Sequence, residues 1–317
     1  MTDTQNEVFK TPVNKIRLFE HGAPGSQNLK LTRKYYTEDM PDGRVKHIVQ
    51  NITDPDIVPY IPDVIGNSTD RQRIPAVLII PGGAFRRLVY NFEGEDVAKW
   101  LNSMGIAAFV LECRLPSDEH DNAEDVPLID AMRAMRVIRG RAQEFGIDEA
   151  KIGVMGFSAG GFMAALLSTA YESDVYADYK YKDEYDKLSA RPDFAVCSYP
   201  VISIDDCIEA GKRYMSEEQV LERISDSKAK ILHKYNPDKL VRPDMPPVFI
   251  CETDDDRTTL SENSVGFYMA ARKAGVSAEL HIFRTGGHGY GCGDDFAQTG
   301  EWKVLFTKWI KSIGIIS

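Results

Sequence analysis

The sequence lacks the apolar segments that would place the chain in a membrane or send it out of the cell. No run of 18 apolar residues occurs anywhere in its 317 residues, so we expect no transmembrane helix. The first residues, MTDTQNEVFKTPVNKIRLFEHG, contain no apolar stretch of the kind found in a signal peptide. We therefore expect a cytoplasmic protein.

An excess of basic charge is also lacking. The chain has 38 lysines and arginines against 48 aspartates and glutamates, which gives a net charge of −10. Nucleic acids and anionic membranes are bound through basic surfaces, so neither is expected as a partner. The sequence leaves open whether copies of the chain associate into a homo-oligomer.

Cysteine is sparse, and recognisable metal motifs are missing. The five cysteines are scattered, and neither C-x-x-C nor H-E-x-x-H occurs. Cys113, Cys197 and Cys251 lie at the ends of apolar runs, where a reduced cysteine acts as a small buried hydrophobe. We expect no metal site and no cofactor.

Apolar strand-like runs alternate with helical patterns from residue 74 onward. The expected strands are residues 74–83, 106–115, 151–157, 193–202, 246–253 and 278–287. The expected helices are residues 94–105, 127–146, 159–171 and 261–275. Apolar strands that alternate with helices predict an α/β fold, with a mostly parallel central sheet covered by helices on both faces. No linker divides the chain, so we expect one domain over residues 1–317.

Three segments depart from this alternation. Residues 1–73 carry the strand-like pieces KHIVQNIT and DIVPYIP, which we expect to extend the sheet as an antiparallel edge. A charged helical insert, at about 203–243, is expected to form a small cap, and a tyrosine-rich stretch covers residues 171–193. Inserts of this kind often lie above the carboxyl ends of the strands, where ligands bind, although a solvated surface helix is the alternative.

The pentapeptide GFSAG places Ser158 between an expected strand and an expected helix. It fits the G-x-S-x-G pattern of a nucleophile elbow. The serine takes a strained conformation at this sharp turn, and glycines two residues away on each side leave room for the chain to fold back. We expect Ser158 to be a nucleophile.

A serine nucleophile needs a base and an acid that orients the base. His288 lies in RTGGHGYGCG, directly after the last expected strand, where glycines allow a loop to bring the ring to the serine. Asp254, Asp255 and Asp256 follow the preceding strand, in the chain order Ser, Asp, His known from α/β-hydrolases. The three aspartates also leave a divalent-cation site as an alternative.

The run LIIPGGAFRR places two glycines at the carboxyl end of a strand, near the expected position of Ser158. Bare backbone there lets a carbonyl oxygen approach the N–H groups of the loop. We expect an oxyanion hole made by Gly83 and Ala159, with Ala84 as a further candidate donor. A simple tight turn is the alternative.

These segments together resemble α/β-hydrolases of the esterase/lipase superfamily, and most of all the bacterial acetyl-xylan-esterase-like branch of carbohydrate esterases. The resemblance covers about residues 74–291 in order, including IPAVLIIPGGAF, IGVMGFSAGGFMA and AELHIFRTGGHGYG. It implies an α/β-hydrolase fold with Ser158 as nucleophile, His288 as base and Asp256 as acid. Asp256 is chosen over Asp255 by its spacing to ENS (residues 262–264) in a pattern similar to D-x-V-V-P-x-E-N-S.

The chain departs from that pattern in three places. It has PGGA where relatives often have a third glycine, TTL in place of V-V-P after the acid, and CRLP in place of Y-R-L-P. The first departure adds the methyl group of Ala84 near the expected acyl site, and the second leaves the choice between Asp255 and Asp256 open.

The resemblance implies a serine ester hydrolase that removes acetyl groups from a carbohydrate such as an acetylated xylo-oligosaccharide. A serine peptidase of the same fold and a non-catalytic binding protein are the alternatives. Tyrosines can stack on sugar rings, so those of the charged segments are expected to contact the substrate. They are Tyr171, Tyr176, Tyr179, Tyr181, Tyr185 and Tyr214.

Overall fold

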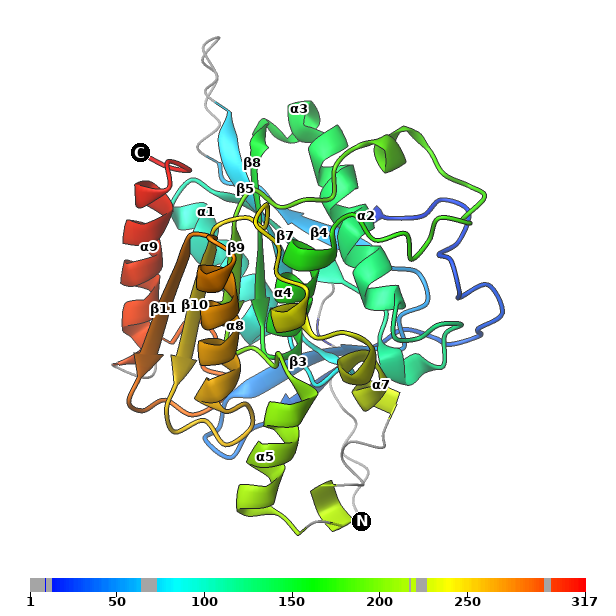
Figure 1. The fold of residues 1–317 in the computed structure, drawn as a ribbon. Coiled ribbons are helices and arrows are strands. Elements are labelled where there is room, and N and C mark those ends of the chain that lie inside the picture. The colour runs from blue at the N-terminus through cyan, green and yellow to red at the C-terminus, as the bar shows by residue number, and fades with distance from the viewer. Residues whose placement is uncertain (1–8, 10–12, 64–72, 217, 221–226, 294–297) are drawn as a thin grey trace.

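An eight-stranded, mostly parallel sheet forms the centre of the molecule (Figure 1). The computed structural model describes residues 9, 13–63, 73–216, 218–220, 227–293 and 298–317. The strand order in the sheet is β1-β4-β7-β5-β8-β9-β10-β11. The strands are β1 (Ile16–Arg17), β4 (Asp56–Tyr60), β5 (Ile74–Ile80), β7 (Ala107–Glu112), β8 (Ile147–Phe157), β9 (Ala195–Ser198), β10 (Val248–Thr253) and β11 (Ala278–Phe283).

The six strands from β7 to β11 in this order run parallel to one another. The strand β4 pairs antiparallel with both of its neighbours, β1 and β7. Four of the six parallel strands, β5, β7, β9 and β10, are short and mostly apolar because both faces of the sheet are covered there, and none of their residues is exposed. The expected parallel sheet is confirmed.

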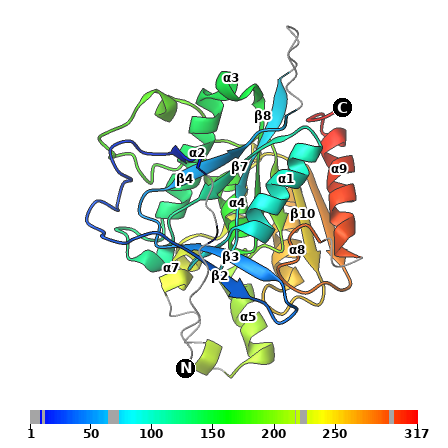
Figure 2. The ribbon, with the colours of Figure 1, turned by 180° about the vertical axis from the view of Figure 1, so that it is seen from behind.

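Helices cover both faces of the sheet. The helices α2 (Val126–Gly140), α4 (Ala159–Ala170) and α8 (Ser261–Lys273) lie on the face toward the viewer in Figure 1. The helices α1 (Asp96–Ser103) and α9 (Trp302–Ser312) lie on the opposite face, which is seen in Figure 2. The expected helix over 127–146 is divided, because a short helix α3 (Ala142–Phe145) follows α2 after a break at Arg141.

The helix α9 was not predicted, although its sequence carries the signal. Trp302, Phe306, Trp309 and Ile310 are buried and recur at helical spacing. They pack on the sheet, where Trp302, Phe306 and Trp309 contact other aromatic rings of the core.

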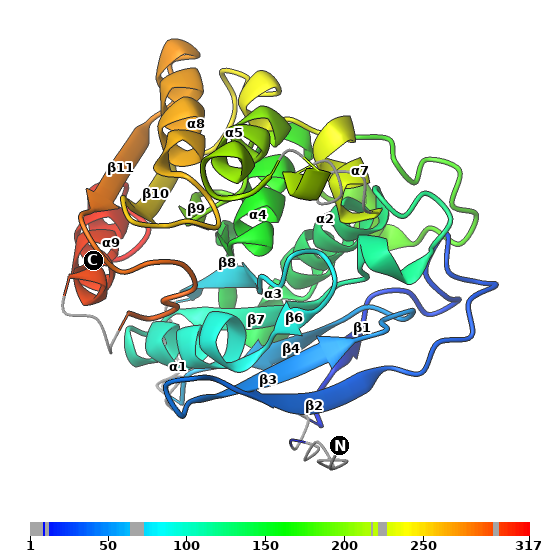
Figure 3. The same ribbon diagram turned by 90° about the horizontal axis from the view of Figure 1, so that it is seen from below.

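The expectation for the N-terminal strands was half right. DIVPYIP forms β4, which pairs antiparallel with β7 as expected. KHIVQNIT was expected at the same edge, but it forms β3 (Val45–Gln50) in a separate sheet with β2 (Lys34–Asp39) and β6 (Leu88–Val89) (Figure 3). The reason is that β1 and β7 already occupy the two edges of β4.

The insert over 203–243 is mainly helical where it is described. It contains α5 (Ile204–Tyr214), α7 (Ser227–Lys234) and a 3-10 turn, η4 (Pro237–Lys239). It is anchored on neighbouring helices, with Arg213 paired to Glu262 of α8 and Lys234 paired to Asp125 at the start of α2.

Within the residues that the structure describes, no helix has both the length and the apolar character needed to cross a bilayer.

Candidate active site

Ser158 lies at the sharp turn between β8 and α4. Its backbone has φ 54° and ψ −119°, a strained conformation for a residue with a side chain. A Cβ atom at Gly156 would collide with the carbonyl of Gly160, and one at Gly160 would collide with the carbonyl of Ile80. The two glycines of GFSAG are therefore required for the chain to fold back tightly enough to present the serine.

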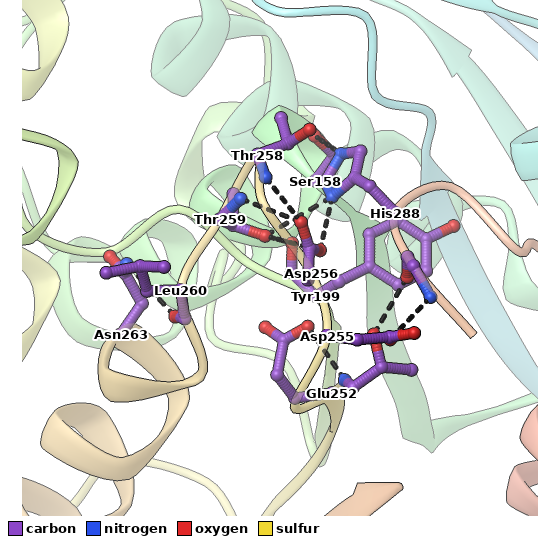
Figure 4. A network of polar contacts seen from close by, with 12 residues as sticks. Ser158, Tyr199, Glu252, Asp255, Asp256, Thr258, Thr259, Leu260, Asn263 and His288 are labelled. Carbon is purple, nitrogen blue, oxygen red and sulfur yellow. Dashed lines mark hydrogen bonds and ion pairs between the residues drawn. The ribbon is translucent and has the colours of Figure 1, made fainter. Parts of the chain in front are cut away.

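The side chains of Ser158, His288 and Asp256 form a continuous hydrogen-bonded relay (Figure 4). His288 Nε2 lies 2.9 Å from Ser158 Oγ, and His288 Nδ1 lies 2.6 Å from Asp256 Oδ2. An ionised carboxylate only accepts hydrogen bonds, so Nδ1 carries the proton that binds Asp256. This tautomer leaves Nε2 free to accept the proton of the serine hydroxyl.

Asp256 is held as an ionised carboxylate in a buried position. Its side chain accepts the N–H groups of Thr258 and Thr259 and the hydroxyl of Thr259, and the residue is only 2% exposed. Burial alone would raise the pKa of Asp256, but the hydrogen bond to His288, the charge of His288 and these N–H groups outweigh it and hold the pKa below the usual value. Asp256 thus stays charged opposite the imidazole.

The neighbouring aspartates point elsewhere. Asp255 is exposed and accepts the N–H of Gly287 at 2.8 Å, in the loop that carries His288. Asp254 is exposed too, and its backbone N–H binds the carbonyl of Phe283. The structure therefore brings Asp256, and neither neighbour, to the imidazole of His288. Among the described residues, no cluster of three His, Cys, Asp or Glu side chains has metal-binding geometry.

A second carboxyl group, Glu252, lies buried close to Asp256. It accepts the N–H of Thr253 and the hydroxyl of Ser264. Burial and then the negative charge of Asp256 raise the pKa of Glu252 well above its usual value. Of these two carboxyl groups, it is therefore Asp256 that carries the charge facing His288.

Hydrogen bonds within the loop after β5 set the directions of the N–H groups of Gly83 and Ala84. In a trans peptide the C=O and the N–H point in opposite directions. The carbonyl of Gly82 accepts the N–H of Val89, so the N–H of Gly83 points the other way. The carbonyl of Gly83 accepts from residues 86 and 87, which turns the N–H of Ala84 away from them in the same manner.

Two conformational features keep this loop in place. Gly83 has φ 138°, where a Cβ atom would collide with the carbonyl of Arg87, so only glycine fits. Ala84 follows in a left-handed conformation with φ 57°.

Ala159, the other expected donor, is the first residue of α4. The N–H of a first helical residue has no partner within the helix, and the positive end of the helix dipole strengthens its attraction for an oxyanion.

A pocket of about 240 Å³ opens at Ser158 and His288. One wall comes from the hairpin of β2 and β3, which contributes Met40, Arg44 and Lys46. The other walls come from the segment after β5 and from Thr258 and Gly289. No pattern in the sequence indicated that the N-terminal hairpin would reach this pocket.

The tyrosine-rich stretch and the helical insert do not line this pocket in the described part of the chain, contrary to expectation. The hydroxyl of Tyr171 binds Asp244, that of Tyr176 binds Asp186, and that of Tyr179 binds the carbonyl of Gly22. Tyr185 packs against Gly140 of α2 and Tyr181 stacks near His21. The tyrosines hold this stretch against α2, the N-terminal segment and the loop before β10, and the side chain of Tyr214 lies outside the described residues.

Two buried residues close to His288 had no role assigned from the sequence: Glu93 lines the pocket, and the ring of Tyr199 packs on the imidazole. Glu93 follows β6 on a π-helical turn, η1 (Asn91–Glu95), and Tyr199 follows β9 with a positive φ of 35°. Glu93 lies within the range of about residues 74–291 that the resemblance covers, but an acidic residue at the start of a helix also has an ordinary explanation in the helix dipole.

Comparison with known proteins gives the same fold and a family. Residues 63–270 match the BD-FAE family. An acetylxylan esterase of Xylanibacter ruminicola is 31% identical over 240 residues, which are 75% of this chain and 45% of that protein. The chain spans less than half the length of the curated relatives it matches.

Two solved structures are similar over nearly their whole length. The acetyl ester-xyloside bifunctional hydrolase from Caldicellulosiruptor lactoaceticus is 37% identical with a TM-score of 0.67, over 84% of this chain and 91% of that one. The carboxylesterase Cest-2923 from Lactobacillus plantarum is 20% identical with a TM-score of 0.68, over 90% and 99% of the two chains, and shows the fold alone. The resemblance inferred from the sequence is confirmed: this chain has an α/β-hydrolase fold and belongs to the BD-FAE family.

Proposed function

We propose that this chain is a serine ester hydrolase that removes short acyl groups, acetyl above all, from carbohydrate alcohols such as acetylated xylo-oligosaccharides. The observation that carries the proposal is the relay from Asp256 through His288 to Ser158, in a pocket that Gly83 and Ala84 also line. The substrate class rests on the names of an acetylxylan esterase and an acetyl ester-xyloside hydrolase among the similar proteins.

The reaction proceeds through an acyl-enzyme. Ser158 Oγ attacks the ester carbonyl carbon, its proton passes to His288 Nε2, and the carbonyl electron pair moves onto the oxygen. The N–H groups of Gly83 and Ala159 bind that oxyanion, with the N–H of Ala84 close by. When the intermediate collapses, the C–O bond to the alcohol breaks and the leaving oxygen takes the proton from Nε2.

Water completes the cycle at the acetylated serine. His288 Nε2 takes a proton from the attacking water, a second oxyanion forms in the same hole, and its collapse releases acetate as Ser158 regains the proton. Asp256 keeps the imidazole in the required tautomer and stabilises the imidazolium in both steps.

A non-catalytic binding protein is disfavoured because such a protein has no need of a strained serine within 2.9 Å of an oriented histidine. A serine peptidase has the same machinery, so only substrates separate the two. Location in the cytoplasm stays a prediction from the sequence, and association into a homo-oligomer stays open.

Replacing the proposed nucleophile tests the function. Ser158→Ala should leave a folded protein whose kcat for p-nitrophenyl acetate is lower by about 10⁴- to 10⁶-fold, because the covalent route is lost. Ser103→Ala, on the exposed end of α1, is the matched control and should retain full activity. Full activity of Ser158→Ala would overturn the proposal.

A substrate panel separates the alternatives. We expect kcat/KM to be highest for acetyl esters and to fall steeply beyond about four acyl carbons, since a small acyl site excludes longer chains. Acetylated xylo-oligosaccharides should be deacetylated and peptide amides left intact. A preference for octanoyl esters, or cleavage of peptides, would contradict this function.

A further inference from the structure

Glu93 is a buried carboxylate at the wall of the Ser158 pocket, outside the relay. It is 5% exposed and lies on η1, the π-helical turn that leads into α1. Both of its oxygens accept hydrogen bonds: Oε2 from the N–H of Gly82 at 2.9 Å, and Oε1 from the hydroxyl of Tyr199 at 2.9 Å. Single-turn π-helices occur frequently at functional sites.

Through Tyr199, Glu93 is connected to the loop that carries His288. The hydroxyl of Tyr199 accepts the N–H of Gly291 at 3.1 Å while it donates to Glu93. The ring of Tyr199 packs edge to face with the imidazole of His288, with centroids 5.0 Å apart. One carboxylate thus links the segment beside the oxyanion donors to the segment that carries the base.

Gly82 lies packed between Glu93 and Ser158, with no room for a side chain. A Cβ atom at Gly82 would lie 2.7 Å from Glu93 Oε2 and 2.9 Å from Ser158 Cβ. Glu93 fixes the N–H of Gly82, and Val89 fixes its carbonyl, so the peptide planes on both sides of Gly82 are set. The second of these planes carries the N–H of Gly83.

The hydrogen bonds of Glu93 are those of an ionised acceptor, since one oxygen accepts from Gly82 and the other from Tyr199. Burial raises the pKa of Glu93 on balance, and the charge of His288 and the two hydrogen bonds offset only part of that rise. The contacts with the two donors, and not the pKa, therefore carry the argument.

We propose that Glu93 is a positioning residue for the ester hydrolysis. Its carboxylate holds the oxyanion loop through Gly82 and the His288 loop through Tyr199, so that the oxyanion donors and the base keep their places relative to Ser158 during the reaction. This inference rests on the proposed function.

Isosteric substitution tests it. Glu93→Gln places an NH₂ group where one carboxylate oxygen accepted, so in the same geometry either Gly82 or Tyr199 loses its acceptor. We expect Glu93→Gln to lower kcat for p-nitrophenyl acetate by about 10- to 100-fold with KM within about threefold, since small displacements of reacting groups act on the transition state. Glu93→Ala should lose more, so that Gln is a partial rescue.

Tyr199→Phe is the second variant, because it removes a single oxygen and is the less disruptive change. It should lower kcat by about tenfold, and the loss in Glu93→Gln/Tyr199→Phe should be smaller than the product of the single losses, because the two side chains act through one hydrogen bond. The matched control is Glu95→Gln on the same turn, where Glu95 pairs with Lys99, and it should keep the wild-type kcat.

A fluorophosphonate probe distinguishes positioning from loss of fold. In Glu93→Gln the final titre should stay at one label per chain, while the rate of labelling and the affinity for a trifluoromethyl ketone fall in parallel with kcat. Unchanged kcat in Glu93→Gln and Tyr199→Phe, or a loss fully explained by a reduced titre, would overturn the inference. A wild-type protein that neither hydrolyses esters nor takes up the probe would overturn the proposed function, and this inference with it.

Discussion

Three consecutive aspartates after β10 have three different surroundings, and only one of them should matter strongly for catalysis. Asp256→Asn should lower kcat by about 10³- to 10⁴-fold, because an amide no longer enforces the imidazole tautomer or stabilises the imidazolium. Asp255→Asn should cost only a few-fold, since its amide oxygen can still accept the N–H of Gly287. Asp254→Asn should be neutral.

Steady-state kinetics of the three variants on p-nitrophenyl acetate check this prediction. Equal melting temperatures would show that the comparison concerns chemistry rather than folding. If Asp255→Asn were the severe variant, the relay would run through Asp255 and the assignment of Asp256 would be wrong.

The residues of the relay could be singled out from the sequence because each follows a strand and carries a local signal. Ser158 has flanking glycines, and His288 lies in a glycine-rich loop. Glu93 and Tyr199 carry no such signal, because their positions depend on a hydrogen bond across 106 residues of chain. Sequence spacing predicts which helices and strands are neighbours. It predicts less well which of their side chains come into contact.

At the scale of elements, the alternating core was predictable and the origin of the pocket walls was not. Parallel strands and covering helices follow from local periodicity. Local periodicity does not indicate which segment packs beside the site, and here the β2–β3 hairpin forms that wall of the pocket. Charged residues of the insert instead form ion pairs with Glu262 of α8 and with Asp125 at the start of α2.

This placement changes which aromatic residue should contact a sugar. Phe92 lines the pocket on η1, with the guanidinium of Arg44 5.3 Å from its ring, whereas Tyr181 is 44% exposed on the tyrosine-rich stretch. Phe92→Ala should raise KM for an acetylated xylo-oligosaccharide by about tenfold, because an apolar ring face can pack on a sugar. Tyr181→Ala should leave it unchanged.

The same two variants assayed on p-nitrophenyl acetate provide the control, since that substrate has no sugar to stack. A loss in Tyr181→Ala confined to the oligosaccharide would show that the tyrosine-rich stretch binds substrate after all.

At the scale of the whole molecule, buried ion pairs join the N-terminal segment to the sheet. Lys15 and Arg33 pair with Glu112 at the end of β7, and Arg33 also pairs with Asp56 of β4. Arg114 pairs with Asp130 of α2 in a fully buried position and donates to the hydroxyl of Ser26. The N-terminal segment is thus packed as part of the same core as the strands that carry the site.

His120 lies in this buried network and should make the fold sensitive to acid. Its Nδ1 lies 3.0 Å from the hydroxyl of Ser26. Burial and then the nearby positive charge of Arg114 lower the pKa of His120 to about 4, from its ordinary value of about 6.5. Because the unfolded chain takes up this proton first, the stability that neutral His120 provides is complete above about pH 6.5 and is lost as the pH falls toward 4.

Urea unfolding at pH 7.0 and pH 4.5 measures this loss. Burial raises the pKa of Asp118 to about 6, and that of Asp56 to about 6 with Glu112 nearby, so these carboxyls gain stability over the same range and oppose the histidine. Both are present in wild type and in His120→Asn, so their contribution cancels between the two proteins. The drop in unfolding free energy from pH 7.0 to 4.5 should be smaller in His120→Asn by about 1 to 2 kcal/mol, less than the full pKa shift implies because solvent screens part of the interaction. An equal drop in both proteins would show that His120 takes up its proton as readily in the folded chain as in the unfolded one.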